Sequence, residues 1–207
     1  MAMGLSRWRD VWRRFSGRGA YPHELAFMLT IPLRRLIQSP RSLVRRLHLQ
    51  PDSRVLELGP GPGYFSADVA RTVPHGRLVL FDLQREMLAK ARRRLRRASA
   101  TNAVFVQGDG SRLPFRSATF DVAFLVAVLG EVPDPAGCVE SLHRVLRPGG
   151  LLSITETIGD PDALSQEDVK ALAASKGFEF VEATVDRVGF TASFRARDIA
   201  SPAEDAR

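Results

Sequence analysis

Hydrophobic positions after residue 50 follow two alternating patterns. Short runs rich in Val, Leu, Ile and Phe are bounded by Gly, Pro, Asp or Asn, which is typical of strands. The predicted strands cover 54–58, 77–81, 103–107, 120–126, 150–156, 179–185 and 190–195. Between them, apolar residues near helical spacing predict helices over 64–72, 85–97, 135–146 and 166–176. This alternation predicts an α/β domain with a mostly parallel sheet.

Two connections in this pattern are unusual. Residues 108–119, between the third and fourth strands, are too polar for a full crossover helix. Only residues 186–189 separate the last two strands, which predicts a hairpin. The last strand should therefore be antiparallel and lie at the sheet edge.

The first 50 residues differ from the rest in composition. Helices are predicted over 5–15, 24–31, 33–37 and 42–47, and Gly and Pro residues interrupt them. We therefore predict a basic helical appendage at 1–50, an α/β domain at 51–197 and a frayed tail at 198–207.

Composition excludes several classes of protein. The chain has 207 residues, of which 44% are hydrophobic and 26% charged, and this is ordinary for a globular domain. Its single Cys and four scattered His offer neither a disulfide nor a metal-ligand spacing, so no metal is expected. With no apolar run long enough for a membrane span and no secretory signal, we expect a cytoplasmic protein. An Arg-rich amphipathic start would equally suit the mitochondrial matrix if the source is eukaryotic.

The net charge of +7 comes from the N-terminal region. Residues 1–50 hold ten Arg against two acidic residues, a balance of +8, while residues 51–207 sum to −1. Trp8, Trp12 and Phe15 share one helix face beside these arginines. The basic face would contact an anionic membrane through residues 1–18, bind nucleic acid, or simply be solvated. The aromatic stripe favours a membrane over nucleic acid, although the contact would be peripheral.

A glycine-rich turn follows the first predicted strand. The acid Glu57 precedes Gly59, Gly61 and Gly63, and a predicted helix begins directly afterwards. Glycines allow a ligand to approach the backbone closely, and the helix start offers unpaired N–H groups. The third glycine of a dinucleotide fingerprint is missing and no P-loop Lys follows. The spacing therefore favours a ligand without a pyrophosphate over a nicotinamide dinucleotide.

Two further carboxylates end neighbouring strands. Asp82 closes the second strand, where it can accept the hydroxyl groups of a ribose or merely cap the next helix. Asp109, followed by Gly110, ends the third strand, where it can accept an adenine amine or simply form a turn. Ligands bind at the carboxyl edge of open α/β sheets, and these residues share that edge.

These residues together resemble the class I S-adenosylmethionine-dependent methyltransferases over about residues 51–195. The resemblance rests on the segment from Glu57 to Gly63, on Asp82, on Gly108-Asp109, on Phe120-Asp121-Val122 and on Leu146-Arg147-Pro148-Gly149-Gly150-Leu151-Leu152. Leu113-Pro114-Phe115 and Val128-Leu129-Gly130-Glu131-Val132-Pro133-Asp134-Pro135 are similar to the branch that includes ubiquinone and menaquinone biosynthesis methyltransferases.

The resemblance implies a fold and a cofactor. The fold is a Rossmann-like seven-stranded sheet with an antiparallel last strand and helices on both faces. The donor is S-adenosyl-L-methionine, and its product is S-adenosyl-L-homocysteine. Glu57 through Gly63 would be the family's first motif, Asp82 its ribose-binding acid and Asp109 its adenine-side acid.

The residues that handle the acceptor are harder to locate from sequence. A general base should lie at the carboxyl ends of the fourth and fifth strands, which points to Glu131 as a catalytic residue and to Glu156 as an acceptor-binding one. Both are otherwise ordinary loop acids. By elimination the appendage covers this edge, so Tyr21 and His23 are expected near an acceptor.

Three functions fit these observations. The leading one is an S-adenosylmethionine-dependent methyltransferase that acts on a small-molecule or lipid acceptor. The alternatives are an RNA or protein methyltransferase of the same fold, and a non-catalytic protein that binds S-adenosylmethionine.

Overall fold

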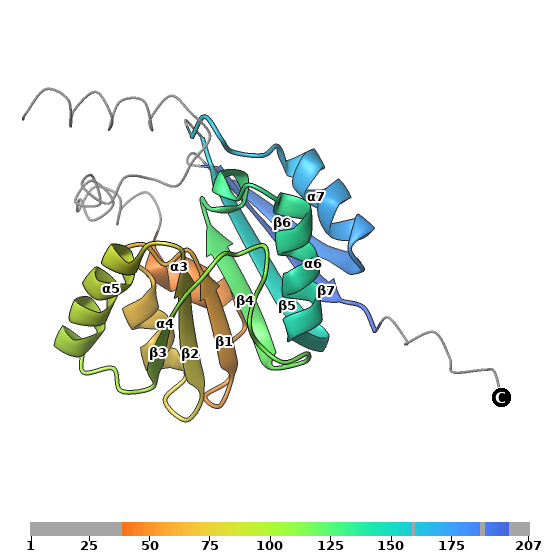
Figure 1. Ribbon diagram of the computed structural model, residues 1–207. Helices are drawn as coiled ribbons and strands as arrows, with labels where there is room; N and C mark the ends of the chain where they lie inside the picture. Colours follow the sequence, from red (N-terminus) through yellow and green to blue (C-terminus); the bar gives the residue numbers. More distant parts are fainter. Residues whose placement is uncertain (1–38, 159, 187–188, 199–207) are drawn as a thin grey trace, which may run out of the picture.

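A single sheet forms the centre of the described structure. The computed structural model describes residues 39–158, 160–186 and 189–198. Within these residues the sheet has seven strands, with α6 and α7 on one face and α3, α4 and α5 on the other (Figure 1). The predicted fold class is therefore confirmed. The helices predicted over 5–15, 24–31 and 33–37, and the tail after residue 198, lie outside the described residues.

The elements follow the predicted alternation. The strands are β1 (Arg54–Leu58), β2 (Arg77–Asp82), β3 (Ala103–Gln107), β4 (Phe120–Val126), β5 (Leu146–Thr157), β6 (Phe178–Asp186) and β7 (Gly189–Ala196). The helices are α3 (Pro40–Arg46), α4 (Ser66–Thr72), α5 (Arg85–Arg97), α6 (Pro135–Val145) and α7 (Gln166–Ser175), with a short 3₁₀ helix, η3 (Leu129–Glu131). As predicted, no helix forms between β3 and β4, where every residue is described.

The strand order is β3-β2-β1-β4-β5-β7-β6. All pairs are parallel except those of β7, which is antiparallel to both β5 and β6. The prediction that the reversed strand lies at the edge is therefore wrong, because β6 occupies the edge. Side-chain burial explains the order, since most of β7 is buried whereas β6, with Glu179 and Glu182, is largely exposed. Small and apolar side chains on both faces suit β7 to an inner position.

β5 begins earlier than residue 150, where the sequence predicted it. Phe120 pairs with Leu146 and Val122 pairs with Leu151, so the residues between Leu146 and Leu151 form a bulge against β4. Gly149 has a φ of 74° in this bulge, and its carbonyl accepts a hydrogen bond from Nη1 of Arg195 at 3.0 Å. The bulge turns the end of α6 directly into the sheet.

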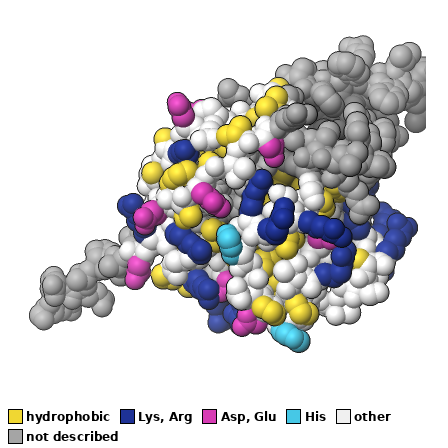
Figure 2. Space-filling view, turned by 180° about the vertical axis from the view of Figure 1, so that it is seen from behind, with side chains coloured by type: hydrophobic (Ala, Val, Ile, Leu, Met, Phe, Trp, Pro, Cys, Tyr) yellow, Lys and Arg dark blue, Asp and Glu magenta, His cyan; other side chains and the backbone are white. Residues whose placement is uncertain are grey.

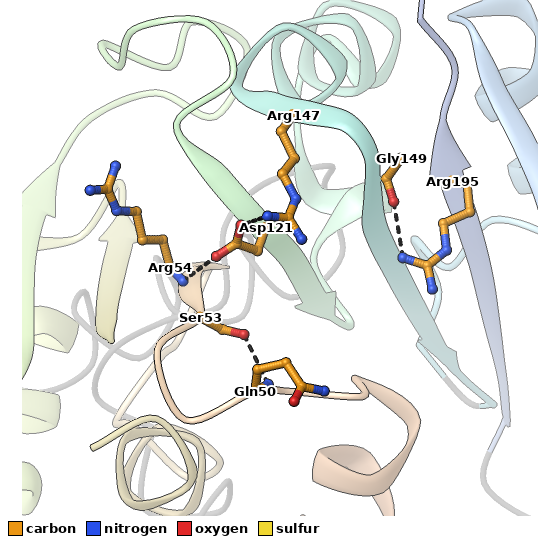
Figure 3. Close-up of polar contacts among 7 residues, drawn as sticks. All are labelled: Gln50, Ser53, Arg54, Asp121, Arg147, Gly149 and Arg195. Atoms are coloured by element: carbon orange, nitrogen blue, oxygen red, sulfur yellow. Dashed lines mark hydrogen bonds and ion pairs between the residues drawn. The ribbon is translucent and has the colours of Figure 1, made fainter. Parts of the chain in front are cut away.

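Asp121 ties three strands together at the amino edge of the sheet (Figure 3). Its Oδ2 accepts the backbone N–H of Arg54 at 2.6 Å, and its Oδ1 lies 2.7 Å from Nη1 of Arg147. Nearby, the Ser53 hydroxyl accepts the N–H of Gln50 at 2.9 Å. Asp121 therefore joins β1, β4 and β5 on the side opposite the carboxyl ends of the strands.

Two apolar clusters hold the helices on the sheet. One packs α6 and α7 against side chains such as Phe81 and Leu125, and the other packs α3, α4 and α5 against the opposite face. Leu43 and Leu47 belong to the second cluster and are buried. The last part of the predicted appendage thus packs on the sheet, while the division into domains stays a prediction.

Charged groups cover the outer faces of the helices. α5 buries Leu88, Ala91 and Leu95 on one side and carries a basic outer face with a single acid, Glu86. In Figure 2 basic and acidic side chains are interspersed over much of the visible face, and Lys and Arg predominate toward its right side. None of the helices in the described part of the chain is long and apolar enough to cross a membrane.

Candidate active site

The turn after β1 requires its three glycines. Gly59, Gly61 and Gly63 have φ values of 65°, 52° and 76°, a region of backbone conformation that residues other than glycine rarely adopt. A Cβ atom on Gly59 would collide with Val128, and one on Gly63 would lie 3.1 Å from the Cα of Ala91. The backbone of this turn is therefore bare at the carboxyl edge of the sheet, as the motif predicted.

Asp82 joins this turn to the end of β2. Its Oδ2 accepts the N–H of Gly61 at 3.2 Å, and its Oδ1 accepts the N–H of Gln84 at 2.8 Å. The side chain is only 8% exposed, and burial raises its pKa to about 6. Asp82 thus organises both the glycine turn and the chain leading into α5, and each oxygen retains a lone pair for a further donor.

Glu57 lies beneath the glycine turn. It is 2% exposed, and its Oε2 has no hydrogen-bond partner among the described residues. Burial raises its pKa to about 8, and the negative charge of Asp82 adds to this. A buried, unsatisfied acceptor beside a bare turn fits a ligand that carries a positive charge and N–H donors.

Asp109 lies two residues after the end of β3 and is exposed. Its Oδ1 accepts the backbone N–H of Ser111 at 2.9 Å, and this bond lowers its pKa. Gly110 follows, where a Cβ would lie 3.3 Å from Leu58, and a Cβ on Gly108 would lie 2.5 Å from the ring of Phe81. Asp109 therefore forms the turn that the sequence allowed as an alternative, and its adenine-binding role stays a prediction.

Two acids meet at the ends of β4 and β5. Glu131 ends η3, and Glu156 lies near the end of β5 with 2% of its surface exposed. Burial raises the pKa of Glu156 to about 8, with smaller contributions from the negative charges of Asp160 and Glu131. The structure thus brings together the two acids that the sequence singled out, whereas Tyr21 and His23 lie outside the described residues.

A pocket opens between α3 and the ends of β4, β5 and β7, and we call it the α3 pocket. Its volume is about 220 Å³. The residues that line it are Ser39, Ser42, Leu43, Arg46, Phe65, Val126, Thr155, Asp186, Gly189, Phe190 and Thr191. Because Thr155 and Glu156 are neighbours in a strand, the pocket and the acidic pair lie on either side of the end of β5.

Sequence reasoning missed several residues at this edge. Arg46 appeared there only as part of a basic run, and its proximity to Thr155 and Thr191 depends on how α3 packs. Ala127, directly after β4, has a φ of 54°, and its N–H donates to the carbonyl of Thr155 at 2.8 Å. Nothing in the sequence marks a left-handed Ala.

Among the described residues, no group of three or more His, Cys, Asp or Glu side chains is arranged to hold a metal ion. Cys138 is buried, and burial raises the pKa of its thiol to about 12. It packs as a small apolar side chain in the core.

Comparison with known proteins agrees with the resemblance drawn from the sequence motifs. Residues 56–154 match the family model of the methyltransferase domain. The arsenite methyltransferase of Halobacterium salinarum is 30% identical over 153 residues, which cover 65% of this chain and 39% of that protein. The ubiquinone/menaquinone biosynthesis C-methyltransferase of Pseudomonas putida is 40% identical over 106 residues, which cover 50% of this chain and 41% of that protein. The chain thus spans less than half the length of these curated relatives.

A solved structure shares the whole fold. The crystal structure of an S-adenosylmethionine-dependent methyltransferase from Aquifex aeolicus superimposes with a TM-score of 0.80 at 19% identity. The match covers 86% of this chain and 100% of that one. The resemblance inferred from the sequence motifs is confirmed: the chain is similar to the class I S-adenosylmethionine-dependent methyltransferases and to their ubiquinone/menaquinone biosynthesis branch.

Proposed function

We propose that this protein transfers a methyl group from S-adenosyl-L-methionine to a small-molecule or lipid acceptor. The observation that carries the proposal is the hydrogen bond that holds the glycine turn against Asp82 at the carboxyl edge of the sheet. This arrangement presents bare backbone N–H groups and an ionisable acceptor in one place. It suits a nucleoside donor without a pyrophosphate.

The residues of the edge match the parts of such a donor. Asp82 accepts the ribose hydroxyls with its remaining lone pairs, and the turn from Gly59 to Gly63 lies against the amino-acid portion. Glu57, with one unsatisfied oxygen, offers an acceptor to the donor from below. Asp109 and Gly110 lie on the adenine side.

The chemistry requires alignment above all. S-adenosylmethionine supplies a methyl group on a positively charged sulfur, so its carbon–sulfur bond breaks as the acceptor atom forms a bond to that carbon. A well-aligned pair of reactants gains roughly 7–11 kcal/mol from proximity alone. The described edge provides this alignment through a rigid turn rather than through a nucleophile.

An acceptor that loses a proton needs a group to take it. We assign this role to Glu131, which ends η3 beside the predicted acceptor space. Glu156, with a pKa of about 8, keeps its proton at neutral pH and donates a hydrogen bond to the acceptor. Changing Glu131→Gln should lower kcat and leave donor affinity unchanged, whereas Glu156→Gln should retain more activity at neutral pH than Glu156→Ala. Glu140→Gln, on the exposed side of α6, is the matched control.

Donor binding is tested by calorimetric titration of the full chain with S-adenosylhomocysteine, with NAD as the parallel control. We expect micromolar or tighter binding of the first and none of the second. Methyl transfer is tested with labelled S-adenosylmethionine and fractionated small-molecule, lipid, RNA and protein extracts. Label in a small-molecule or lipid fraction supports the proposal, and label in RNA or protein overturns the acceptor class. Donor binding without any transfer would identify a non-catalytic binding protein.

The predicted membrane contact needs its own experiment because residues 1–18 lie outside the described residues. Removing residues 1–18 should abolish binding to vesicles of anionic lipid and spare binding of S-adenosylhomocysteine. Equal vesicle binding by both forms would contradict the contact.

A further inference from the structure

Arg46 brings a positive charge to the α3 pocket. Its Nη1 donates a hydrogen bond to the Thr191 hydroxyl at 3.3 Å, and that hydroxyl lies 2.9 Å from the hydroxyl of Thr155. Both threonines are buried, with 5% and 6% of their surfaces exposed, while Arg46 is half-buried. The three side chains form one polar chain from α3 to β5.

This polar chain leaves the guanidinium with donors to spare. A guanidinium has five N–H donors in a planar fork, and it matches the two oxygens of a carboxylate. Within the part of the chain that the structure describes, Arg46 forms no ion pair with a carboxylate, and its side-chain hydrogen bond is the one to Thr191. A half-buried cation with one neutral partner favours an anionic ligand.

Asp186 is the acidic residue among those that line the pocket. Its Oδ1 accepts the N–H of Gly189 at 3.2 Å, so this carboxylate holds the turn between β6 and β7. The negative charge of Asp186 repels an anion in the pocket. A variant that lacks this charge measures the repulsion.

Ser39 and Ser42 also line the pocket, and the rest of its wall is apolar and adjoins the donor site. Phe65 lies two residues after Gly63 and is 8% exposed, and Val126 directly precedes the left-handed Ala127. Leu43, which is 6% exposed, completes this wall from α3. A volume of about 220 Å³ exceeds the roughly 150 Å³ of a cavity that holds benzene. A flat ring with one acidic substituent fits such a space.

We propose that the α3 pocket binds the carboxylate of the methyl acceptor, so that the acceptor is a small organic acid with an apolar body. Arg46 pairs with the carboxylate, Thr191 donates to it, and Phe65 and Leu43 contact the body. The inference rests on the proposed methyl transfer for the identity of its ligand, but the binding itself can be measured separately.

The test uses three probes of one shape: 2-naphthoate, its neutral amide and the corresponding naphthylmethylamine cation. Each is titrated into the full chain with S-adenosylhomocysteine present. We expect the acid to bind at least tenfold more tightly than the amide, and the amine to bind most weakly. Asp186→Asn, which keeps an acceptor for the N–H of Gly189, should strengthen binding of the acid.

Variants on α3 supply the controls. Arg46→Gln should remove the preference for the acid, while Arg45→Gln, an exposed neighbour, should keep it. The affinity for S-adenosylhomocysteine reports that each variant is folded. Three results would overturn the proposal while S-adenosylhomocysteine still binds. They are equal affinities for the acid and the amide, tightest binding of the amine, and an unchanged preference for the acid in Arg46→Gln. If S-adenosylhomocysteine fails to bind the unmodified chain, the proposed donor site is wrong, and the three probes still report on the pocket.

Discussion

The backbone N–H of Gly61 donates a hydrogen bond to Oδ2 of Asp82, 21 residues further along the chain. This contact joins the turn after β1 to the end of β2, so the shape of the glycine turn depends on the charge of one carboxylate. The same carboxylate also accepts the N–H of Gln84. Asp82 therefore has a structural role and a proposed ribose-binding role at once, and substitutions can separate them.

Replacing Asp82 with Ala should weaken binding of S-adenosylhomocysteine by tenfold or more. Each hydrogen bond to a charged acceptor contributes about 1.5–3 kcal/mol, and the ribose would lose its acceptor. Asp82→Asn should recover only part of the stability that Asp82→Ala loses, since its single amide oxygen can accept one of the two backbone N–H groups. Calorimetry measures the affinity, and chemical denaturation measures the stability. The control is Asp52→Ala, because Asp52 is exposed at the opposite edge of the sheet. Unchanged affinity in Asp82→Ala would leave Asp82 a purely structural role.

Glu57 should make stability depend on pH. Its pKa is about 8 in the folded protein and near 4.5 in the unfolded chain, so between these values only the folded form keeps the proton. The free energy of unfolding therefore falls as pH rises from about 4.5 to 8. Glu57→Gln removes this contribution, and its advantage over the unmodified protein should grow across that window to the order of a few kcal/mol. Urea denaturation at several pH values measures it.

The exposed Glu86→Gln on α5 serves as the control for Glu57. A difference between Glu57→Gln and the unmodified protein that stays constant from pH 5 to 8 would contradict the raised pKa.

Ala127 should gain stability when it becomes glycine. A left-handed φ costs a residue with a Cβ roughly 1–2 kcal/mol, part of which is offset by the greater freedom of glycine in the unfolded chain. We expect Ala127→Gly to raise the free energy of unfolding by about 0.5–1 kcal/mol. Ala118→Gly, with a φ of 52° in the turn before β4, should do the same. Ala127 borders the proposed donor site and Ala118 does not, so only Ala127→Gly should weaken binding of S-adenosylhomocysteine. If Ala127→Gly binds it as tightly as the unmodified protein does, Ala127 does not contribute to that site.

Asp121→Ala should destabilise the sheet without touching the donor site. The change removes the acceptor of the Arg54 N–H and the partner of Arg147. Loss of a hydrogen bond to a charged group costs about 1.5–3 kcal/mol, whereas the exposed ion pair adds little. Thermal unfolding should show a lower Tm, and S-adenosylhomocysteine should bind with unchanged affinity below that temperature. Weakened donor binding by folded protein would place Asp121 in the ligand site instead.

Local patterns predicted the strands that have turn residues on both sides. β1, β3 and β4 begin and end where predicted because turn residues bound a short apolar run on both sides. β5 does not, because Arg147 to Gly150 resembles a turn and becomes part of a strand only through pairing across a bulge. The position of β7 between β5 and β6 could not be predicted from local patterns either, since it depends on which strands pair with its two edges.

The donor side of the site was predictable for the same reason. Gly59, Gly61 and Gly63 encode their unusual φ values directly, and Asp82 lies at a strand end that topology brings beside them. The α3 pocket was not predictable, because Arg46 and Thr191 are 145 residues apart and meet only through packing. The raised pKa of Glu57 likewise arises from burial, which no spacing reveals.

The position of β7 between β5 and β6 has a consequence for biosynthesis. During translation β6 emerges before its partner exists, because its ladder forms with residues 189–196 alone. Until then β5 presents an open edge, and Phe180, Val181 and Val185 of β6 have no sheet to join. The sheet therefore stays incomplete until residues 189–196 have emerged from the ribosome, and this nascent state is the one most exposed to aggregation and to chaperones.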